Sequence, residues 1–430
     1  MEEREKEALY NGIQGFVGKW WNGSDLYPDP CGWTPIQGVS CDLFNGSWYV
    51  TSLNIGPVYD NSLDCTPNPE FTHHLFDLNH LKSLSFYNCF TRNTLTLPAS
   101  NWDKLANNLQ ALEFRSNPGL TGEIPASFGT LKSLQSLVLL QNGLTGQLPA
   151  EMGNLVNLKR LVIAGNRLVG PVPDGLGNLN KLLILDLNRN FLSGSMPLTF
   201  GNLTSLLKLD LSRNNLEGKL PMEIGNLRNL TLLDLSGNKF SGGLPNSLQE
   251  MVSLNEMALS NNPIGGDLNG IQWENLENLE FLDLSNTDLT GKIPDSLTEL
   301  KRLRFLGLIN NSLSGNISPR FEDMPCISAL YLNGNNFTGE IGFSVSFYGK
   351  MGSRFGVSGN PNLCSSVGVV GSRNAPIGVK SCEKEKSGGV PDIDLIGRIS
   401  VGKWNQNSQC TLFGFRGKEM VIFLVWIMVL

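Results

Sequence analysis

Acidic side chains recur at an almost constant spacing through the middle of the chain. Asp186, Asp210 and Asp234 are 24 residues apart, and Glu113 and Asp283 occupy equivalent positions of the same pattern. Paired carboxylates can act as general acid and base, but only where a pocket holds them at a defined separation. A ladder of acids along an open strand surface offers no such pocket. We therefore favour a structural origin, because the segment LDLS suits strands that are repeated.

The three histidines are the other residues that suggest chemistry. His73, His74 and His80 lie close together in the sequence, without partners at the spacing of a metal site, so we expect no bound metal. The sequence also lacks a Ser-His-Asp arrangement, a nucleophile elbow, a glycine-rich phosphate loop and the kinase motifs HRD and DFG. These features predict a protein that is not an enzyme and has no cofactor.

A larger set of charged and aromatic side chains suits binding better than catalysis. These residues alternate with leucines and should point outward from short strands. Arginines can anchor carboxylates, and aromatic rings supply contact area, so the surface could hold an extended peptide or a protein loop. Any one of these positions could equally be a solvated face without a ligand. The candidates are Arg115, Arg160, Asp186, Arg189, Lys208, Asp210, Arg213, Asp234, Glu256, Phe281, Asp283 and Tyr331.

A repeated unit of 24 or 25 residues must position these side chains. An asparagine marks each unit, with aliphatic or aromatic residues eight, five and three positions before it, which is the frame LxxLxLxxN. Thr287 replaces the asparagine once. The marking asparagines are Asn117, Asn142, Asn166, Asn190, Asn214, Asn238, Asn262, Asn311 and Asn335.

The spacing predicts the structure of each unit. LxLxx is a short strand whose leucines face inward, while the asparagine turns inward at the corner and satisfies backbone groups of the next loop. Stacked units then form one parallel sheet over a continuous leucine core. A single unit cannot bury its own leucines, so the motif must repeat.

A second signature, L-x-G-x-I/L-P, follows the asparagine, as in LTGEIP (120–125) and LSGSMP (192–197). This form resembles the plant-specific subclass of leucine-rich repeats. The resemblance implies an α/β repeat solenoid: a plant-type leucine-rich-repeat horseshoe with a parallel β-sheet on its concave face and disulfide-bonded N- and C-terminal caps. One interval, 262–287, carries an extra residue within NGIQWENL (269–276). It predicts either a tolerated convex bulge or a bend that exposes Trp273 to a partner.

The two ends carry the cap motifs of that family. Residues 2–21 predict a helix with an apolar stripe through Ala8, Ile13, Phe16 and Val17. The segment DPCGWTPIQGVSCD resembles the N-terminal cap of plant extracellular leucine-rich-repeat proteins, and GNPNLC with the later GVKSC resembles the C-terminal cap.

The eight cysteines gather mostly near these ends, which favours disulfides and an oxidising compartment. The cap resemblance implies a Cys31–Cys41 bridge and places Cys364 and Cys382 in the C-terminal cap. We expect a further bridge between Cys65 and Cys89. We interpret Cys326 as a buried thiol, and its pairing with Cys410 stays open. Seven Asn-x-Ser/Thr sequons fit a secreted glycoprotein: Asn22, Asn45, Asn202, Asn229, Asn310, Asn316 and Asn336.

The net charge of −6 argues against nucleic acid as the main partner. We divide the chain into an N-terminal cap (1–48), about 11 repeats (49–342), a C-terminal cap (343–383), a polar linker (384–419) and an apolar tail (420–430). The first residues lack the apolar core of a signal peptide, so we expect the true leader to lie upstream. The tail is too short to cross a bilayer, since eleven helical residues span about 16–17 Å. It favours a lipid-anchor signal or another membrane association.

The leading hypothesis is a non-catalytic recognition protein on the extracellular side of the plasma membrane. It would bind a protein or peptide ligand, act with a receptor-kinase partner and serve plant–microbe recognition in defence or symbiosis. The alternative is an apoplastic inhibitor of microbial wall-degrading enzymes, similar to polygalacturonase-inhibiting proteins.

Overall fold

The computed structural model describes residues 1–57, 63–366 and 378–382. They lie in one compact unit, Met1–Glu383. The predicted linker and tail, 384–430, lie outside the described residues, as does Cys410. Among the described residues, no helix combines the length and apolar character needed to span a bilayer.

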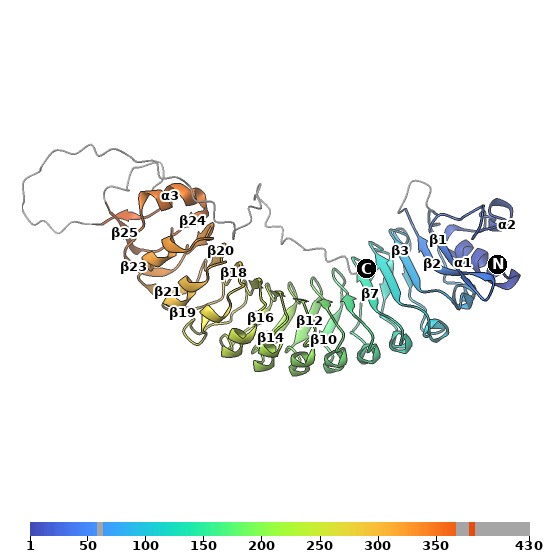
Figure 1. The fold of residues 1–430 in the computed structure, drawn as a ribbon, viewed down its shortest axis with the longest axis horizontal. Helices are drawn as coiled ribbons and strands as arrows, with labels where there is room; N and C mark the ends of the chain where they lie inside the picture. Colours follow the sequence, from blue (N-terminus) through green and yellow to red (C-terminus); the bar gives the residue numbers. More distant parts are fainter. Residues whose placement is uncertain (58–62, 367–377, 383–430) are drawn as a thin grey trace, which may run out of the picture. The chain divides into compact units, whose positions relative to one another are not determined.

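A parallel sheet runs along the concave side of this unit, preceded by one antiparallel hairpin (Figure 1). Each strand pairs with the equivalent residues of the next unit, so side chains at one repeat position form continuous columns across the sheet. In the described part of the chain the sheet has 14 strands in this order: β1 Val39–Phe44, β2 Ser47–Ile55, β3 Ser83–Tyr87, β5 Ala111–Arg115, β7 Ser136–Leu140, β9 Arg160–Val162, β11 Ile184–Asp186, β13 Lys208–Asp210, β15 Leu232–Asp234, β17 Glu256–Ala258, β18 Phe281–Asp283, β20 Phe305–Gly307, β22 Ala329–Tyr331 and β24 Phe355–Gly356.

The repeat asparagines connect successive turns, as the spacing predicts. Asn190 donates from Nδ2 to the carbonyl oxygens of Ile163 (2.7 Å) and Leu187 (3.1 Å), and its Oδ1 accepts from the N–H of Leu168 (3.2 Å). Each amide therefore satisfies backbone groups of its own turn and of the preceding turn, which would otherwise be buried without partners. Thr287 keeps part of this pattern, because its Oγ1 donates to the carbonyl of Leu284 (2.6 Å).

Short strands form where the sequence pattern L-x-G-x-I/L-P occurs. Glycines such as Gly122 (φ 80°) and Gly194 (φ 77°) adopt the left-handed conformation that permits this tight path. Three smaller sheets result among the described residues. They comprise β4 Leu95–Thr96, β6 Leu120–Gly122 and β8 Gly143–Leu144; β10 Val169–Pro171, β12 Phe191–Gly194, β14 Asn215–Gly218 and β16 Lys239–Phe240; and β19 Thr290–Gly291, β21 Ser312–Gly315, β23 Asn336–Glu340, β25 Asn362–Ser365 and β26 Lys380–Ser381.

Short 3₁₀ turns, rather than long helices, face the convex side, and most of those in the central repeats begin directly after the proline of the pattern. They are η1 His73–Asp77, η2 Trp102–Leu105, η3 Ala126–Thr130, η4 Ala150–Asn154, η5 Asp174–Asn178, η6 Leu198–Asn202, η7 Met222–Asn226, η8 Asn246–Glu250, η9 Trp273–Asn275, η10 Asp295–Glu299, η11 Pro319–Asp323 and η12 Gly352–Arg354.

Helices cover the open ends of the core. The N-terminal helix α1 (Glu3–Val17) buries the predicted stripe and ends at Gly18, whose φ of 104° few other residues tolerate. A single turn, α2 (Gly23–Leu26), follows it. At the other end, Ser344 caps α3 (Val345–Met351) by accepting from the N–H of Phe347 (3.2 Å).

Disulfides close a loop within each cap and link residues of the first turns. The pairs are Cys31–Cys41, Cys65–Cys89 and Cys364–Cys382, with Cα–Cα distances of 5.7, 5.2 and 4.8 Å. The interpretation of Cys326 as a buried thiol is wrong, because Cys326 is half-buried and disulfide-bonded.

The irregular interval at 262–287 accommodates its extra residue without exposing an aromatic side chain. Trp273 is fully buried, and its Nε1 donates to the carbonyl of Leu268 at 3.0 Å. The alternative that Trp273 is an exposed anchor is therefore wrong. The ring instead fills the space inside the coil where other turns place leucine or phenylalanine.

Candidate ligand-binding surface

Four charged side chains at the centre of the concave sheet form a compact cluster, which we call the ionic ladder: Asp186, Lys208, Asp210 and Asp234. Lys208 Nζ lies 2.8 Å from Asp186 Oδ2 and 3.5 Å from Asp210 Oδ2. Asp234 Oδ1 accepts from the N–H and hydroxyl of Ser236 at 2.9 and 2.6 Å. The three aspartates are at most 8% exposed because neighbouring strands cover them. They lie on the predicted face, yet they contact one another more than the solvent.

Burial and mutual repulsion shift the protonation of the ladder. Desolvation, then the charge of Asp210, raises the pKa of Asp186 and raises that of Asp234 to about 6. Burial alone would lower the pKa of Lys208, but the carboxylates of Asp186 and Asp210 outweigh it and raise the value. The lysine thus stays charged and compensates part of the acidic charge beside it. With three carboxylates and one ammonium, the ladder keeps a net negative charge at neutral pH.

Two further acids, Glu256 and Glu280, follow the ladder toward the C-terminus, at other positions of their repeats than the aspartates. Burial, followed by the charges of Glu280 and Asp234, raises the pKa of Glu256. Glu280 pairs with Arg304, whose Nε lies 3.2 Å from Glu280 Oε2. Asp283, which is 6% exposed, accepts from the N–H of Ser285 at 3.1 Å. Repeated aspartates here therefore stabilise the strand ends, in agreement with a structural origin for LDLS.

Aromatic rings occupy the same columns further along the sheet. We call Phe281, Phe305 and Tyr331 the aromatic shelf. Phe281 and Phe305 stack with ring centroids 4.4 Å apart and planes inclined by 11°, and Tyr331 lies 5.7 Å from Phe305. All three are half-buried, so their faces remain available to a ligand. Gly307 makes room, since a Cβ there would lie 3.0 Å from Phe305 Cε1.

An apolar patch, separate from the leucine core, lies on strands β7 to β11. It consists of Val138, Leu140, Val162, Ala164 and Ile184. Beside it, Arg115 pairs with Glu113 (Nε to Oε2, 2.7 Å), and Arg160 carries a buried Nε without a hydrogen-bond partner among the described residues. Burial, followed by the charge of Arg115, lowers the pKa of Arg160. The N-terminal half of the face is thus a mixture of apolar and basic groups.

Arg189 and Arg213 lie on neighbouring turns, directly before the inward asparagines. Both are exposed and adopt left-handed backbone conformations, with φ of 53° and 55°. Neither guanidinium forms an ion pair within residues 1–57, 63–366 and 378–382. Two such cations suit a carboxylate or another anion of a ligand.

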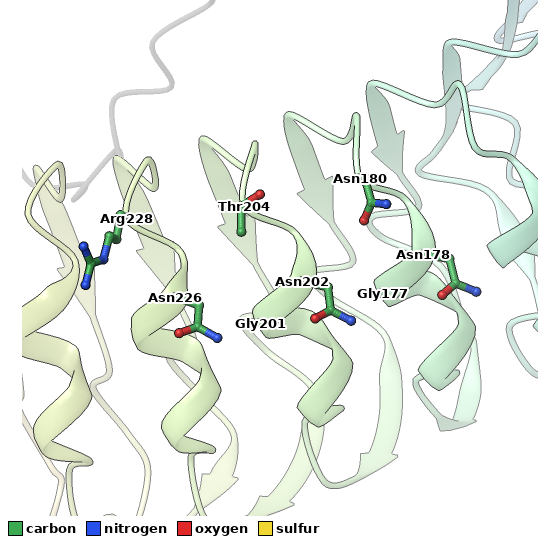
Figure 2. Close-up of a pocket in the computed structure, with 8 residues that line it drawn as sticks. All are labelled: Gly177, Asn178, Asn180, Gly201, Asn202, Thr204, Asn226 and Arg228. Carbon is green, nitrogen blue, oxygen red and sulfur yellow. The ribbon is translucent and has the colours of Figure 1, made fainter.

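A shallow hollow lies on the side formed by the 3₁₀ turns η5 to η7. Figure 2 shows the amides of Asn178, Asn202 and Asn226 aligned along three successive turns, with Arg228 at one end. Arg228 pairs with Glu250 at 2.9 Å. The hollow also contains one sequon asparagine, Asn202, which is exposed. A glycan on it would fill this space, so we assign ligand binding to the concave face instead.

The other predicted glycosylation positions, Asn22, Asn45, Asn229, Asn310, Asn316 and Asn336, are also exposed.

Sequence reasoning overlooked Phe305 and the apolar patch. Counting 24 residues from Phe281 leads directly to Phe305, and the same register assigns Val138 and Val162 to the acidic column. The repeat spacing alone therefore identifies these positions.

Comparison with known proteins agrees with this geometry. The family model described as leucine rich repeat matches residues 180–240, and a related model matches 157–179 and 278–300. The chain is 70% identical over 388 residues to Piriformospora indica-insensitive protein 2 of Arabidopsis thaliana, covering 89% of this chain and 92% of that protein. The chain is a plant leucine-rich-repeat protein. This finding confirms the family resemblance and the predicted fold class.

More distant matches to this leucine-rich-repeat protein are a receptor-like protein and the structures of plant receptors. Receptor like protein 29 of Arabidopsis thaliana is 35% identical over 149 residues, 33% of this chain and 30% of the relative. The structure of the plant peptide hormone receptor RGFR1 in complex with RGF2 is 31% identical (TM-score 0.60), covering 69% of this chain and 45% of the receptor chain. The PEPR1–AtPEP1 complex is 26% identical (TM-score 0.63), with 85% and 51% covered. The leucine-rich-repeat chain thus spans about half the length of these receptor chains.

Proposed function

We propose that this protein is a non-catalytic recognition module that binds an extended peptide or protein segment along its concave face. It acts at the extracellular side of the plant plasma membrane, with a receptor kinase as signalling partner, in the recognition of microbes during defence or symbiosis.

The half-exposed aromatic shelf is the observation that supports ligand binding most directly. An unoccupied repeat face needs no stacked rings there, because leucines inside the coil already supply the core. Aromatic side chains contribute large contact areas at low entropic cost, and they are enriched at binding sites. Along the sheet the shelf follows the ionic ladder, which would present a rigid, acidic floor to the middle of the ligand.

Two arginines on the turns that carry the ionic ladder support a direction for the ligand. The exposed Arg189 and Arg213 suit an anionic group, whereas Glu256 and Glu280 lie at the approach to the shelf. A ligand with an acidic group at one end and apolar or aromatic residues at the other would match this order. Receptors of similar fold are described in complex with peptide hormones, which supports the same type of ligand.

The disulfides of both caps fit an extracellular location. The name of the 70% identical relative supports a role in the response to a fungus. Membrane association would follow from the apolar tail at 420–430, which lies outside the described residues. A receptor-kinase partner would transmit the signal.

The experiment compares three versions of the tagged full-length gene in plants that lack it. These are the wild type, the shelf variant Phe305→Ala/Tyr331→Ala and the control Val345→Ala, an exposed apolar position on α3. We expect all three to be secreted and glycosylated, and only the shelf variant to lose the root response to the fungus. A cytosolic, unglycosylated wild type, or a fully active shelf variant, would refute the proposal. Inhibition of fungal polygalacturonase by the purified protein would favour the inhibitor hypothesis instead.

A further inference from the structure

Three potential metal ligands come together on the turn η1, outside the concave face. The ligand atoms of His73, His74 and Asp77 all lie within 4.8 Å of one another. The two imidazole rings are 3.9 Å apart and inclined by 34°. The expectation that these histidines lack partners at metal spacing is therefore wrong for His73 and His74. The partner is an aspartate four residues after His73, on the same 3₁₀ turn.

We propose that His73, His74 and Asp77 form a binding site for a zinc ion. Two imidazoles and one carboxylate are a ligand set that zinc accepts, whereas magnesium and calcium prefer oxygen ligands alone. Zinc bonds of about 2.1 Å in tetrahedral geometry place ligand atoms about 3.4 Å apart. The three side chains must close by about 1 Å, which rotation of the exposed His73 permits.

The turn itself is held firmly, so the ligands are presented by a rigid backbone. Leu75 and Phe76, between the ligands in sequence, are buried in the core. The hydroxyl of Thr72 donates to the carbonyl of Asn11 on α1 at 3.3 Å. A fixed backbone reduces the entropy lost when the side chains close around an ion.

A neighbouring lysine competes with the ion. Lys104, on the next turn η2, lies with its Nζ 3.0 Å from Asp77 Oδ1. This ammonium neutralises the carboxylate when no metal is bound and must move aside, or share the carboxylate, when zinc binds. This arrangement predicts that removing the lysine charge strengthens zinc binding, whereas removing any one ligand weakens it.

The third histidine does not belong to the site. His80 packs against Tyr49 and Phe44, with ring centroids 4.0 and 4.9 Å apart. It therefore offers a matched control within the same segment. Three protein ligands leave a fourth zinc position open toward the surface, where a water molecule or a side chain of a partner protein can complete the coordination.

The test is calorimetric titration of the untagged full-length protein with Zn²⁺ in a buffer that does not bind metals. We expect one saturable site. His74→Ala and Asp77→Asn should each weaken it by at least about tenfold, Lys104→Met should tighten it several-fold, and His80→Gln should leave it unchanged. Zinc should also raise the melting temperature of the wild type, because binding to the folded state alone stabilises it.

Spectroscopy provides an independent measurement of the ligands. Cu²⁺ bound at the same site should give an electron paramagnetic resonance spectrum with two nitrogen ligands, reduced to one in His73→Ala. The absence of saturable zinc binding would overturn the proposal. So would an affinity that His73→Ala or His74→Ala leaves unchanged, or a Lys104→Met variant that does not bind more tightly.

Discussion

The ionic ladder and the aromatic shelf occupy equivalent positions on one sheet, yet they differ in almost every physical respect. In the ladder, charges at neighbouring positions compensate one another and are buried. In the shelf, rings stack and stay half-exposed. The backbone register is the same in both regions. The difference teaches that the neighbours in a column, and not the position alone, decide whether a side chain supports the scaffold or remains available for contact.

The largest expected effect comes from removing the cation of the ladder. Lys208→Met leaves Asp186 and Asp210 buried without compensation, which should lower the free energy of unfolding by about 3–5 kcal/mol at neutral pH. Urea denaturation followed by circular dichroism measures it. Lys239→Met, at an exposed position, is the control and should change little. A loss below about 1 kcal/mol, typical of exposed ion pairs, would mean that the ladder does not act as a buried cluster.

The ladder should also make stability depend on pH, whereas the shelf should not. Burial and the charge of Asp210 raise the pKa of Asp234 from 3.8 to about 6. Between those values the folded protein keeps a proton that the unfolded chain releases, so stability falls as pH rises through this window. Asp234→Asn removes the effect and still accepts from Ser236.

From pH 4 to pH 7, the free energy of unfolding of the wild type should therefore fall by about 2–3 kcal/mol relative to that of Asp234→Asn. Denaturation curves at intervals of one pH unit measure this change. Phe305→Leu, compared with the wild type in the same way, should show a constant difference. A flat difference for Asp234→Asn would contradict the raised pKa.

A substitution of Gly307 tests whether the stacking of the shelf rings depends on the space that this glycine leaves beside Phe305. In Gly307→Ala, the new Cβ would lie 2.7 Å from Asp283 Oδ1 and 3.0 Å from Phe305 Cε1. We expect a loss of about 1–2 kcal/mol, together with a changed near-ultraviolet circular dichroism spectrum as the ring moves. Gly270→Ala meets no atom within 4 Å and is the matched control. An unchanged spectrum would show that the ring does not rely on Gly307.

The smallest effect on stability is expected at the exposed arginines. Arg213→Met removes a charge that has no ion pair in the described part of the chain, so the free energy of unfolding should change by less than about 0.5 kcal/mol. Ligand binding should weaken nevertheless, because the cation is available to a ligand. The same denaturation assay measures the first quantity. A loss above about 1 kcal/mol would place Arg213 in the scaffold with the ladder.

The repeat register was predictable because the spacing of leucines and asparagines determines which residues of each turn point inward. Every inward Asn and Leu follows from the frame LxxLxLxxN, and the columns of the concave face follow from it too. The cap helix was predicted to extend four residues too far at its C-terminal end, since Gly18, with its φ of 104°, ends it before Trp20 and Trp21.

Burial within the columns was not predictable from one repeat alone. Asp234 and Tyr331 occupy the same position of their units, but only the former is covered by neighbouring strands and side chains. Trp273 was ambiguous for the same reason, because its burial depends on how the extra residue at 269–276 is accommodated. The histidine cluster also required a structure, since the curvature of the turn brings Asp77 back toward His73.

Every inward asparagine forms hydrogen bonds to its own coil and to the coil before it. Unfolding of a central coil would therefore leave buried polar groups without hydrogen-bond partners on both sides. Melting should therefore begin at an extremity and advance coil by coil, as a zipper opens. The cystines stand at these extremities. A reducing agent should consequently widen the thermal transition, because fraying starts earlier while the central coils still melt at nearly the same temperature.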